Sequence, residues 1–157
     1  MKTLEALLAE HPLFHDLDAD MLATLAACAS DVHFPAGHVI FREGEDAHRF
    51  YVIREGTVAL EAFHLELGSI VLQTLDPGQV LGWSWLVPPY KWHFDARCLT
   101  DVRAFALDGA VLRNKCMEEP RLGYELLKRF AMLLEQRLQT TRRQLFDAFA
   151  VRELSRV

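Results

Sequence analysis

Short apolar runs separated by turn-forming residues occupy the middle of the chain, and this pattern limits the fold more than any other feature. Between Val32 and Asp108 the runs cover residues 39–41, 50–53, 58–60, 70–72, 80–81 and 103–107. Strand-sized segments at intervals of about 8 to 12 residues are typical of a β-sandwich or jelly-roll barrel. Glu55-Gly56 separates two runs and predicts a tight hairpin with the glycine at positive φ.

Helical patterns flank this region on both sides. Leucines recur at helical spacing near the N-terminus, Pro12 ends that pattern, and Asp18 or Asp20 can cap a second helix. After residue 109 the pattern is helical again, with Pro120 at a suitable helix start and no proline or glycine after Gly123. We therefore predict one domain over residues 1–157, with helices in 3–30, a β-barrel in 32–108 and C-terminal helices in 110–150.

The last predicted helix carries an apolar heptad pattern. The positions, spaced alternately by four and three, are Leu127, Ala131, Leu134, Leu138, Thr141, Leu145 and Ala148, which we call the seam. A second stripe of Leu126, Phe130 and Leu133 offers a side that can face the barrel. One small barrel cannot cover a helix of about 40 Å, so we expect the seam to form a homodimer. The alternative is that the seam packs along its own barrel.

Composition restricts the class of protein. Hydrophobic residues make up 51% of the 157 residues, and no apolar run of about 18 residues or signal peptide is evident, so a cytoplasmic globular protein without membrane segments is expected. Cys28, Cys98 and Cys116 form no CxxC pair, which favours reduced, mostly buried thiols. The net charge of -5 argues against nucleic-acid binding by the whole domain, although residues 121–157 carry eight basic and four acidic side chains.

Three spaced motifs point to a known family. Residues 34–47, 50–58 and 75–82 resemble, in order, the turn and strand motifs of a cyclic nucleotide-binding domain. The chain is most similar to the sensor half of the bacterial catabolite activator and fumarate-nitrate regulator family. That resemblance implies an eight-stranded jelly-roll barrel, leading helices, and dimerisation through the long last helix. In the family a helix-turn-helix domain follows, and because the sequence ends at Val157 we expect no direct DNA binding by this chain.

The ligand-binding cassette departs from the family pattern. Where the family has a glutamate for the ribose hydroxyl, this sequence has Trp83, and where it has arginine followed by serine or threonine for the cyclic phosphate, it has Trp92 and His93. A buried phosphate needs a charged partner such as a guanidinium. We therefore expect that cyclic AMP is not bound in the usual way, although a cyclic nucleotide is the cofactor that the resemblance implies.

All three tryptophans lie between Gly82 and Asp95, together with Tyr90 and Phe94. Two interpretations remain open: the indoles fill the nucleotide cavity, or they line a remodelled pocket for a planar ligand or a protein partner. The candidate ligand-binding residues are Gly82, Trp83, Ser84, Trp92 and His93, with Thr141 and Arg142 on the last helix. Of these, Thr141 keeps a hydroxyl where the resemblance implies contact with the nucleotide base.

No nucleophile elbow, Walker loop or pair of catalytic carboxylates is evident, so we expect a regulatory domain, not an enzyme, acting on an unidentified protein partner. The seven histidines form no HxH or HxxxH pair, and no metal site is expected. Two alternatives remain: a sensor of a small ligand or haem that uses the altered pocket, and a cupin-like metal enzyme.

Overall fold

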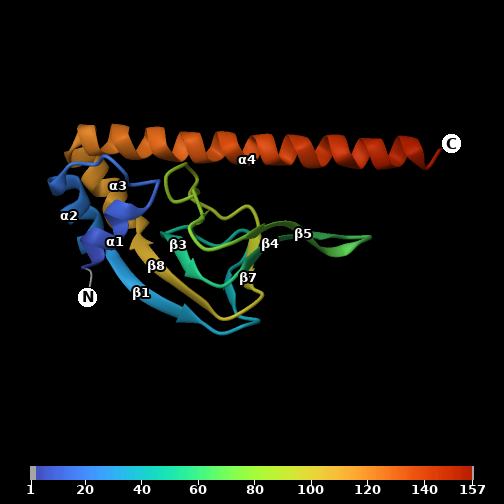
Figure 1. The fold of residues 1–157 in the computed structure, drawn as a ribbon, viewed down its shortest axis with the longest axis horizontal. Helices are drawn as coiled ribbons and strands as arrows, with labels where there is room; N and C mark the ends of the chain where they lie inside the picture. The colour runs from blue at the N-terminus through green and yellow to red at the C-terminus, as the bar shows by residue number, and fades with distance from the viewer. Residues whose placement is uncertain (1–2, 157) are drawn as a thin grey trace.

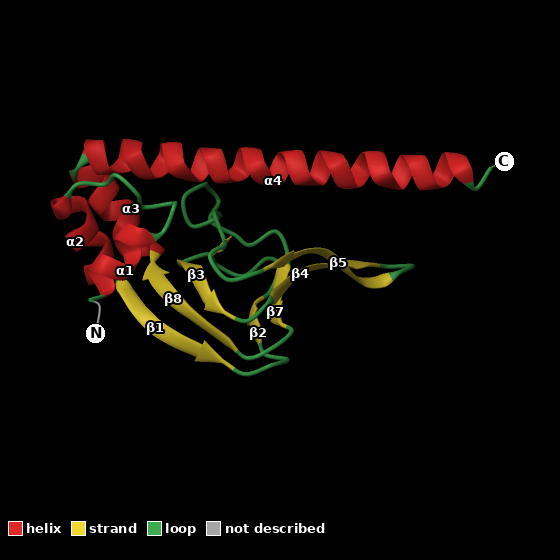
Figure 2. Cartoon of the chain, viewed as in Figure 1, coloured by secondary structure: helices red, strands yellow, loops and turns green. Residues whose placement is uncertain are grey.

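The computed structural model describes residues 3–156, which fold into a β-barrel with helices at one end and along one side (Figures 1 and 2). The strands are β1 (Ala29–Phe34), β2 (Val39–Phe41), β3 (Arg49–Glu55), β4 (Val58–His64), β5 (Gly68–Leu75), β6 (Val80–Leu81), β7 (Asp95–Cys98) and β8 (Val102–Asp108). The helices are α1 (Leu4–Glu10), α2 (Ala19–Ala27), α3 (Gly109–Glu118) and α4 (Pro120–Leu154).

The strands form two antiparallel four-stranded sheets, in the orders β1-β8-β3-β6 and β2-β7-β4-β5. This arrangement confirms the predicted jelly-roll barrel. The β3–β4 turn also has the predicted form, because Gly56 has φ +91° and a Cβ there would lie 2.2 Å from the Asp101 carbonyl oxygen. Two boundaries differ from the prediction: β1 already begins at Ala29, and α4 continues to Leu154. Residues 1, 2 and 157 of the predicted domain lie outside the described part.

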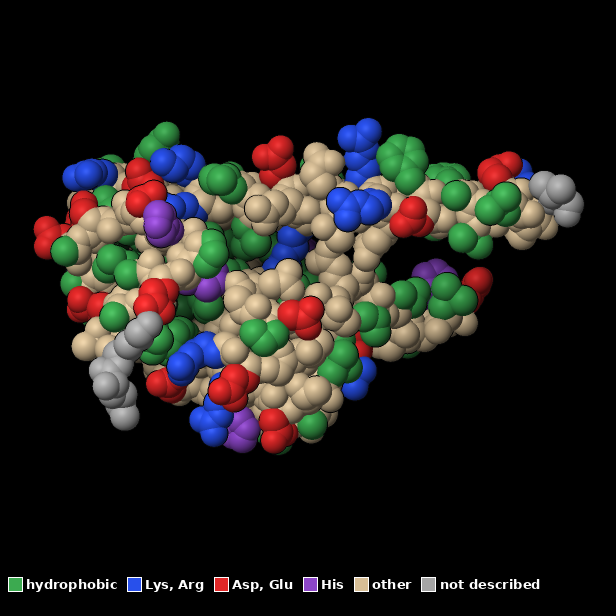
Figure 3. All heavy atoms as spheres, in the orientation of Figure 1, with side chains coloured by type: hydrophobic (Ala, Val, Ile, Leu, Met, Phe, Trp, Pro, Cys, Tyr) green, Lys and Arg blue, Asp and Glu red, His purple; other side chains and the backbone are tan. Residues whose placement is uncertain are grey.

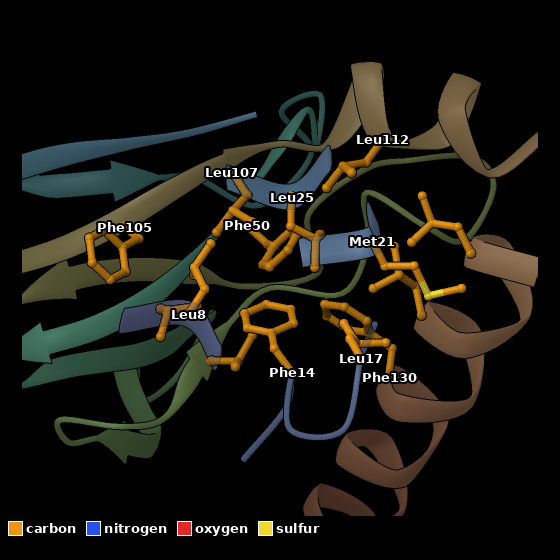
Figure 4. Packing of buried hydrophobic residues seen from close by; sticks show 14 of the residues in the cluster. Leu8, Phe14, Leu17, Met21, Leu25, Phe50, Phe105, Leu107, Leu112 and Phe130 are labelled. Atoms are coloured by element: carbon orange, nitrogen blue, oxygen red, sulfur yellow. The ribbon is translucent and has the colours of Figure 1, made fainter. Parts of the chain in front are cut away.

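A hydrophobic core joins the N-terminal helices, the first sheet and the start of α4. The Asp18 carboxylate caps α2 by accepting from the Met21 N–H at 2.9 Å, so the first of the two predicted caps is used. Phe14, Phe50 and Phe130 are fully buried and meet between these elements, as Figure 4 shows. A second buried cluster fills the space between the two sheets. The cassette between β6 and β7 contributes side chains to both cores.

Helix α4 has two different halves. Leu126 and Phe130 of the second apolar stripe are buried against the body of the domain, as predicted, while Leu133 is half-buried and Leu122, outside the predicted stripe, is also buried. From Thr141 to Arg156 every side chain is exposed. The β4–β5 hairpin extends beside this half (Figure 1), and the Gln144 side-chain amide donates to the Leu72 carbonyl at 3.0 Å. The domain thus presents a long helix and a hairpin that its own barrel does not cover.

The His11 side chain connects the segment after α1 to the turn before β6 through hydrogen bonds. Its Nε2 lies 2.5 Å from the Gly78 carbonyl oxygen, and its Nδ1 accepts from the Leu13 N–H at 3.0 Å. The second contact requires the neutral ring, because an imidazolium has no acceptor nitrogen. Burial accordingly lowers the pKa of His11 below its usual 6.5, against a smaller opposing effect of the Gly78 contact.

This lowered pKa predicts a loss of stability in mild acid. The unfolded chain binds a proton at His11 more readily than the folded one, so the stabilisation is complete above pH 6.5 and is lost as the pH falls toward the lowered pKa. The free energy of unfolding, from denaturant titrations at about pH 7.5 and about pH 5, should fall less in His11→Gln than in the wild type. An equal fall in both proteins would contradict the assignment.

Candidate functional site

The cassette between β6 and β7 begins at a glycine that makes room for an indole. Gly82 has φ +99°, and a Cβ added there would lie 2.6 Å from Cη2 of Trp92. The Trp92 ring stacks on Phe41 with 3.8 Å between centroids and an interplanar angle of 7°. Trp92 is only 4% exposed and belongs to the core between the two sheets. Gly82 and Trp92, two of the candidate residues, are therefore in direct contact.

Side-chain burial alternates from Trp92 onward, as is typical of a strand. Trp92, Phe94, Ala96 and Cys98 are buried, and the residues between them are exposed or half-buried. Arg97 lies on the other face from Trp92, and its Nε donates to the Glu61 carboxylate at 2.9 Å. The guanidinium of Arg97 is thus engaged with a buried acid on β4 and does not replace a cassette arginine.

Trp83 is half-buried and connects the cassette to α4. Its ring makes an edge contact with Phe94 at 5.6 Å, and the Arg137 guanidinium lies 4.9 Å from the Trp83 ring centroid. Arg137 also donates to the Val80 carbonyl. Burial lowers the pKa of Arg137 to about 10. Because Trp83 occupies the position where the family resemblance implies a glutamate, the arginine here faces an aromatic ring instead of a carboxylate.

Sequence reasoning missed Arg137. It is one basic residue among eight in residues 121–157, and no motif distinguishes it. The available signal is its position four residues before Thr141, which places it on the adjacent helical turn. A comparison of α4 with the altered cassette positions could have suggested the contact with Trp83.

The third indole lies in a different core. Trp85 is fully buried and stacks on Phe50 at 5.0 Å, with Phe130 of α4 in edge contact at 5.3 Å. Its neighbour Ser84 is also buried, at 2% exposure. The three tryptophans therefore do not form one aromatic platform: Trp92 packs between the sheets, Trp85 packs under the helices, and Trp83 lies between them.

The other candidate residues are apart from this group. His93 is exposed beside the buried Trp92. Thr141 and Arg142 lie on the exposed half of α4, where the Thr141 hydroxyl donates to the Arg137 carbonyl at 2.9 Å and Arg142 lies 5.5 Å from the Phe146 ring. Within this chain the structure brings together Gly82, Trp83 and Trp92. His93, Thr141 and Arg142 are exposed to solvent instead.

The three cysteines of the chain all have raised thiol pKa values. Cys98 is buried, and burial raises its pKa to about 11, the opposite of what a redox-sensing thiolate needs. Burial also raises the pKa of Cys28 and Cys116. Within residues 3–156 no three His, Cys, Asp or Glu side chains gather as metal ligands do. None of the helices described is long and apolar enough to cross a membrane.

The fold is thus a jelly-roll barrel with a cassette between β6 and β7 and a long helix that rests on that cassette. Residues 31–119 match the family model of the cyclic nucleotide-binding domain. The chain belongs to this family.

The chain is similar to a transcriptional regulator and to solved structures of the family. The chain is 28% identical over 144 residues to the CRP-like cAMP-activated global transcriptional regulator of Mycobacterium tuberculosis H37Rv, covering 92% of this chain but only 62% of that relative. A cyclic nucleotide-binding protein structure from Geobacter metallireducens GS-15 superposes with TM-score 0.78 and 29% identity, covering 88% of this chain and 99% of the other. Thermus thermophilus catabolite activator protein superposes with TM-score 0.67 and 25% identity, over 85% of this chain and 61% of that one.

The packing of Trp92 predicts a large loss of stability on truncation. Trp92→Ala removes a buried ring and leaves a cavity between the sheets, which should cost about 3–5 kcal/mol of unfolding free energy. His93→Ala changes the exposed neighbour and should stay within about 0.5 kcal/mol of the wild type. Both values come from denaturant titration at one protein concentration. A small effect of Trp92→Ala would show that the ring does not support the barrel.

Proposed function

We propose that this domain is a regulatory module that does not bind cyclic AMP in the usual way of its family, because Trp92 takes the place of the phosphate ligand. The observation that carries the proposal is the indole of Trp92, stacked on Phe41 and pressed against Gly82 at the start of the cassette. A nucleotide phosphate entering there would meet an apolar surface and lose its hydration without a compensating cation.

The charges near the cassette support this proposal. Lys91 is paired with Asp46 outside the barrel, and Arg97 is held by Glu61. Arg137 lies on the helix side of Trp83. The exposed histidine His93 follows Trp92 at the position where a hydroxyl is implied by the resemblance. The candidate residues Gly82, Trp83, Ser84 and Trp92 would then act mainly as packing that couples the barrel to α4.

We infer that the domain works as a homodimer through the exposed half of α4 and the β4–β5 hairpin. Large apolar side chains on these two elements are more than 40% exposed: Phe63, Leu65, Leu67, Val71, Leu72, Leu138, Leu145, Phe146, Phe149, Val151 and Leu154. Figure 3 shows hydrophobic side chains, interspersed with charged ones, on both elements. Exposed apolar side chains in this number favour burial against a partner, and the seam supplies a coiled-coil pattern for a second copy.

In such a dimer, Thr141 and Arg142 would belong to the interface and would reach the partner's barrel more readily than their own. The net charge of -5 disfavours nucleic acid as the direct target of the domain. We therefore propose that the domain acts on a protein in the cytoplasm. Changes in how α4 rests on the cassette would carry that signal.

Isothermal titration with cyclic AMP and cyclic GMP tests the central proposal. We expect no binding at micromolar concentrations, because the cassette lacks the phosphate-binding arginine. The matched variant Trp83→Glu/Trp92→Arg/His93→Ser restores the residue types of the family pattern and should gain affinity if it folds. Micromolar binding by the wild type would overturn the proposal whatever the variant does.

Sedimentation equilibrium tests the dimer. The mass should be about 36 kDa, twice the 18.0 kDa of one chain. Leu145→Glu places a charge at an exposed seam position and should shift the mass toward the monomer. Gln139→Glu adds the same charge to α4 outside the seam and should leave the dimer intact. A wild-type mass near 18 kDa at micromolar concentration would rule the dimer out.

A further inference from the structure

A cavity separate from the barrel interior lies where three segments meet. Its volume is about 320 Å³, and its walls come from the segment after α1, the turn before β6 and the first half of α4. The apolar part of the wall includes Pro12, Leu13, Val80, Met132 and Leu133. The polar part is formed by His11, Gln79, Gln136, Arg129 and Arg137.

Two of the arginines that line this cavity each have a buried guanidinium nitrogen without a partner. Nε of Arg129 and Nη1 of Arg137 are fully covered, and neither has a hydrogen-bond acceptor within residues 3–156. A buried charged donor that makes no hydrogen bond is costly, by about 1–3 kcal/mol or more. Two such donors at one cavity are unusual in a folded protein, because buried polar groups are nearly always paired.

Each arginine is held in place by its other nitrogens. Arg129 reaches the Glu125 carboxylate through Nη2 at 3.3 Å, and its side chain is 15% exposed. Arg137 is fixed by the Val80 carbonyl and by the Trp83 ring. No Asp or Glu is among the residues that line the cavity. The two guanidinium groups are therefore preorganised, and the one acid that contacts them, Glu125, is not among the residues that line the cavity.

The other polar wall residues add no positive charge. His11 uses Nε2 toward Gly78 and Nδ1 as an acceptor from Leu13, which requires a neutral ring. The Gln79 side-chain oxygen accepts from the Asp76 N–H at 2.7 Å. The two arginines thus supply the charge that a ligand would meet.

We propose that this cavity binds a small organic anion, a carboxylate or phosphate monoester with a short apolar body. Guanidinium groups are well suited to both head groups, since their planar N–H donors match carboxylate and phosphate oxygens. The apolar wall accommodates the body of the ligand and excludes a fully hydrated inorganic ion. The head group would complete the hydrogen bonding of Arg129 and Arg137.

This site is distinct from both the barrel interior and the proposed dimer interface. The helical period of about 100° per residue places Arg129, Met132 and Gln136 on the side of α4 opposite Leu138 and Leu145. Arg137 nevertheless also touches the cassette through Trp83. An anion bound to Arg137 would therefore strengthen the contact between α4 and the cassette, a direct route from ligand to helix.

Isothermal titration of the full chain with hexanoate and hexyl phosphate tests the proposal, with hexanol and inorganic phosphate as probes of the two halves of the ligand. The variants are Arg129→Gln and Arg137→Gln, and the control is Arg143→Gln, an exposed arginine of α4. Circular dichroism checks that each variant folds. Trp83 fluorescence provides a second readout, because the Arg137 guanidinium lies over that ring.

At least one of the two organic anions should bind, and the tighter one identifies the head group. Hexanol and inorganic phosphate should bind at least about tenfold more weakly than that anion. The Arg129→Gln variant should bind the anion about tenfold more weakly than the wild type, and Arg143→Gln should bind it as the wild type does. Absence of binding up to about 10 mM, equal binding of hexanol, or unchanged affinity in Arg129→Gln would overturn the proposal. The outcome with cyclic AMP does not affect this test.

Discussion

The contact of Trp85 with Phe50 and Phe130 is the interaction on which the arrangement of the domain depends. The three rings come from the cassette, strand β3 and helix α4, and all pairs lie 5.0 to 5.3 Å apart. Gly109, at the start of α3, permits this packing because a Cβ there would lie 2.8 Å from Cβ of Trp85. Each aromatic pair adds about 0.5–1.5 kcal/mol beyond its buried area, so the cassette is rigidly tied to the long helix.

The three indoles hold the altered cassette in place. Trp85 fixes the cassette to the helices, Trp92 packs between the sheets, and Trp83 lies between them under Arg137. A cassette that a nucleotide organises in other members of the family is here organised by its own indoles, according to our proposal. The contact between Trp83 and Arg137 adjoins both the barrel and the cavity with Arg129.

Much of the fold was predictable because it depends on local patterns. The continuous buried run of β3, the glycine of the β3–β4 turn, the Asp18 cap and the start of α4 at Pro120 all follow from nearby residues. Strand β1 was expected three residues late, since its first residues Ala29 and Ser30 carry no strong strand preference. The long apolar seam was also visible, and it is exposed where the barrel ends.

The sequence by itself determined the barrel and the long helix, because each depends on residue type and spacing along the chain. Tertiary structure alone decided that the three indoles have three different environments, and that Arg129 and Arg137 meet His11 around one cavity. His11 is far from the two arginines in the sequence, and the long side chains of the arginines and tryptophans can take many directions. Only the packing of α4 against the barrel selects the directions that bring them together.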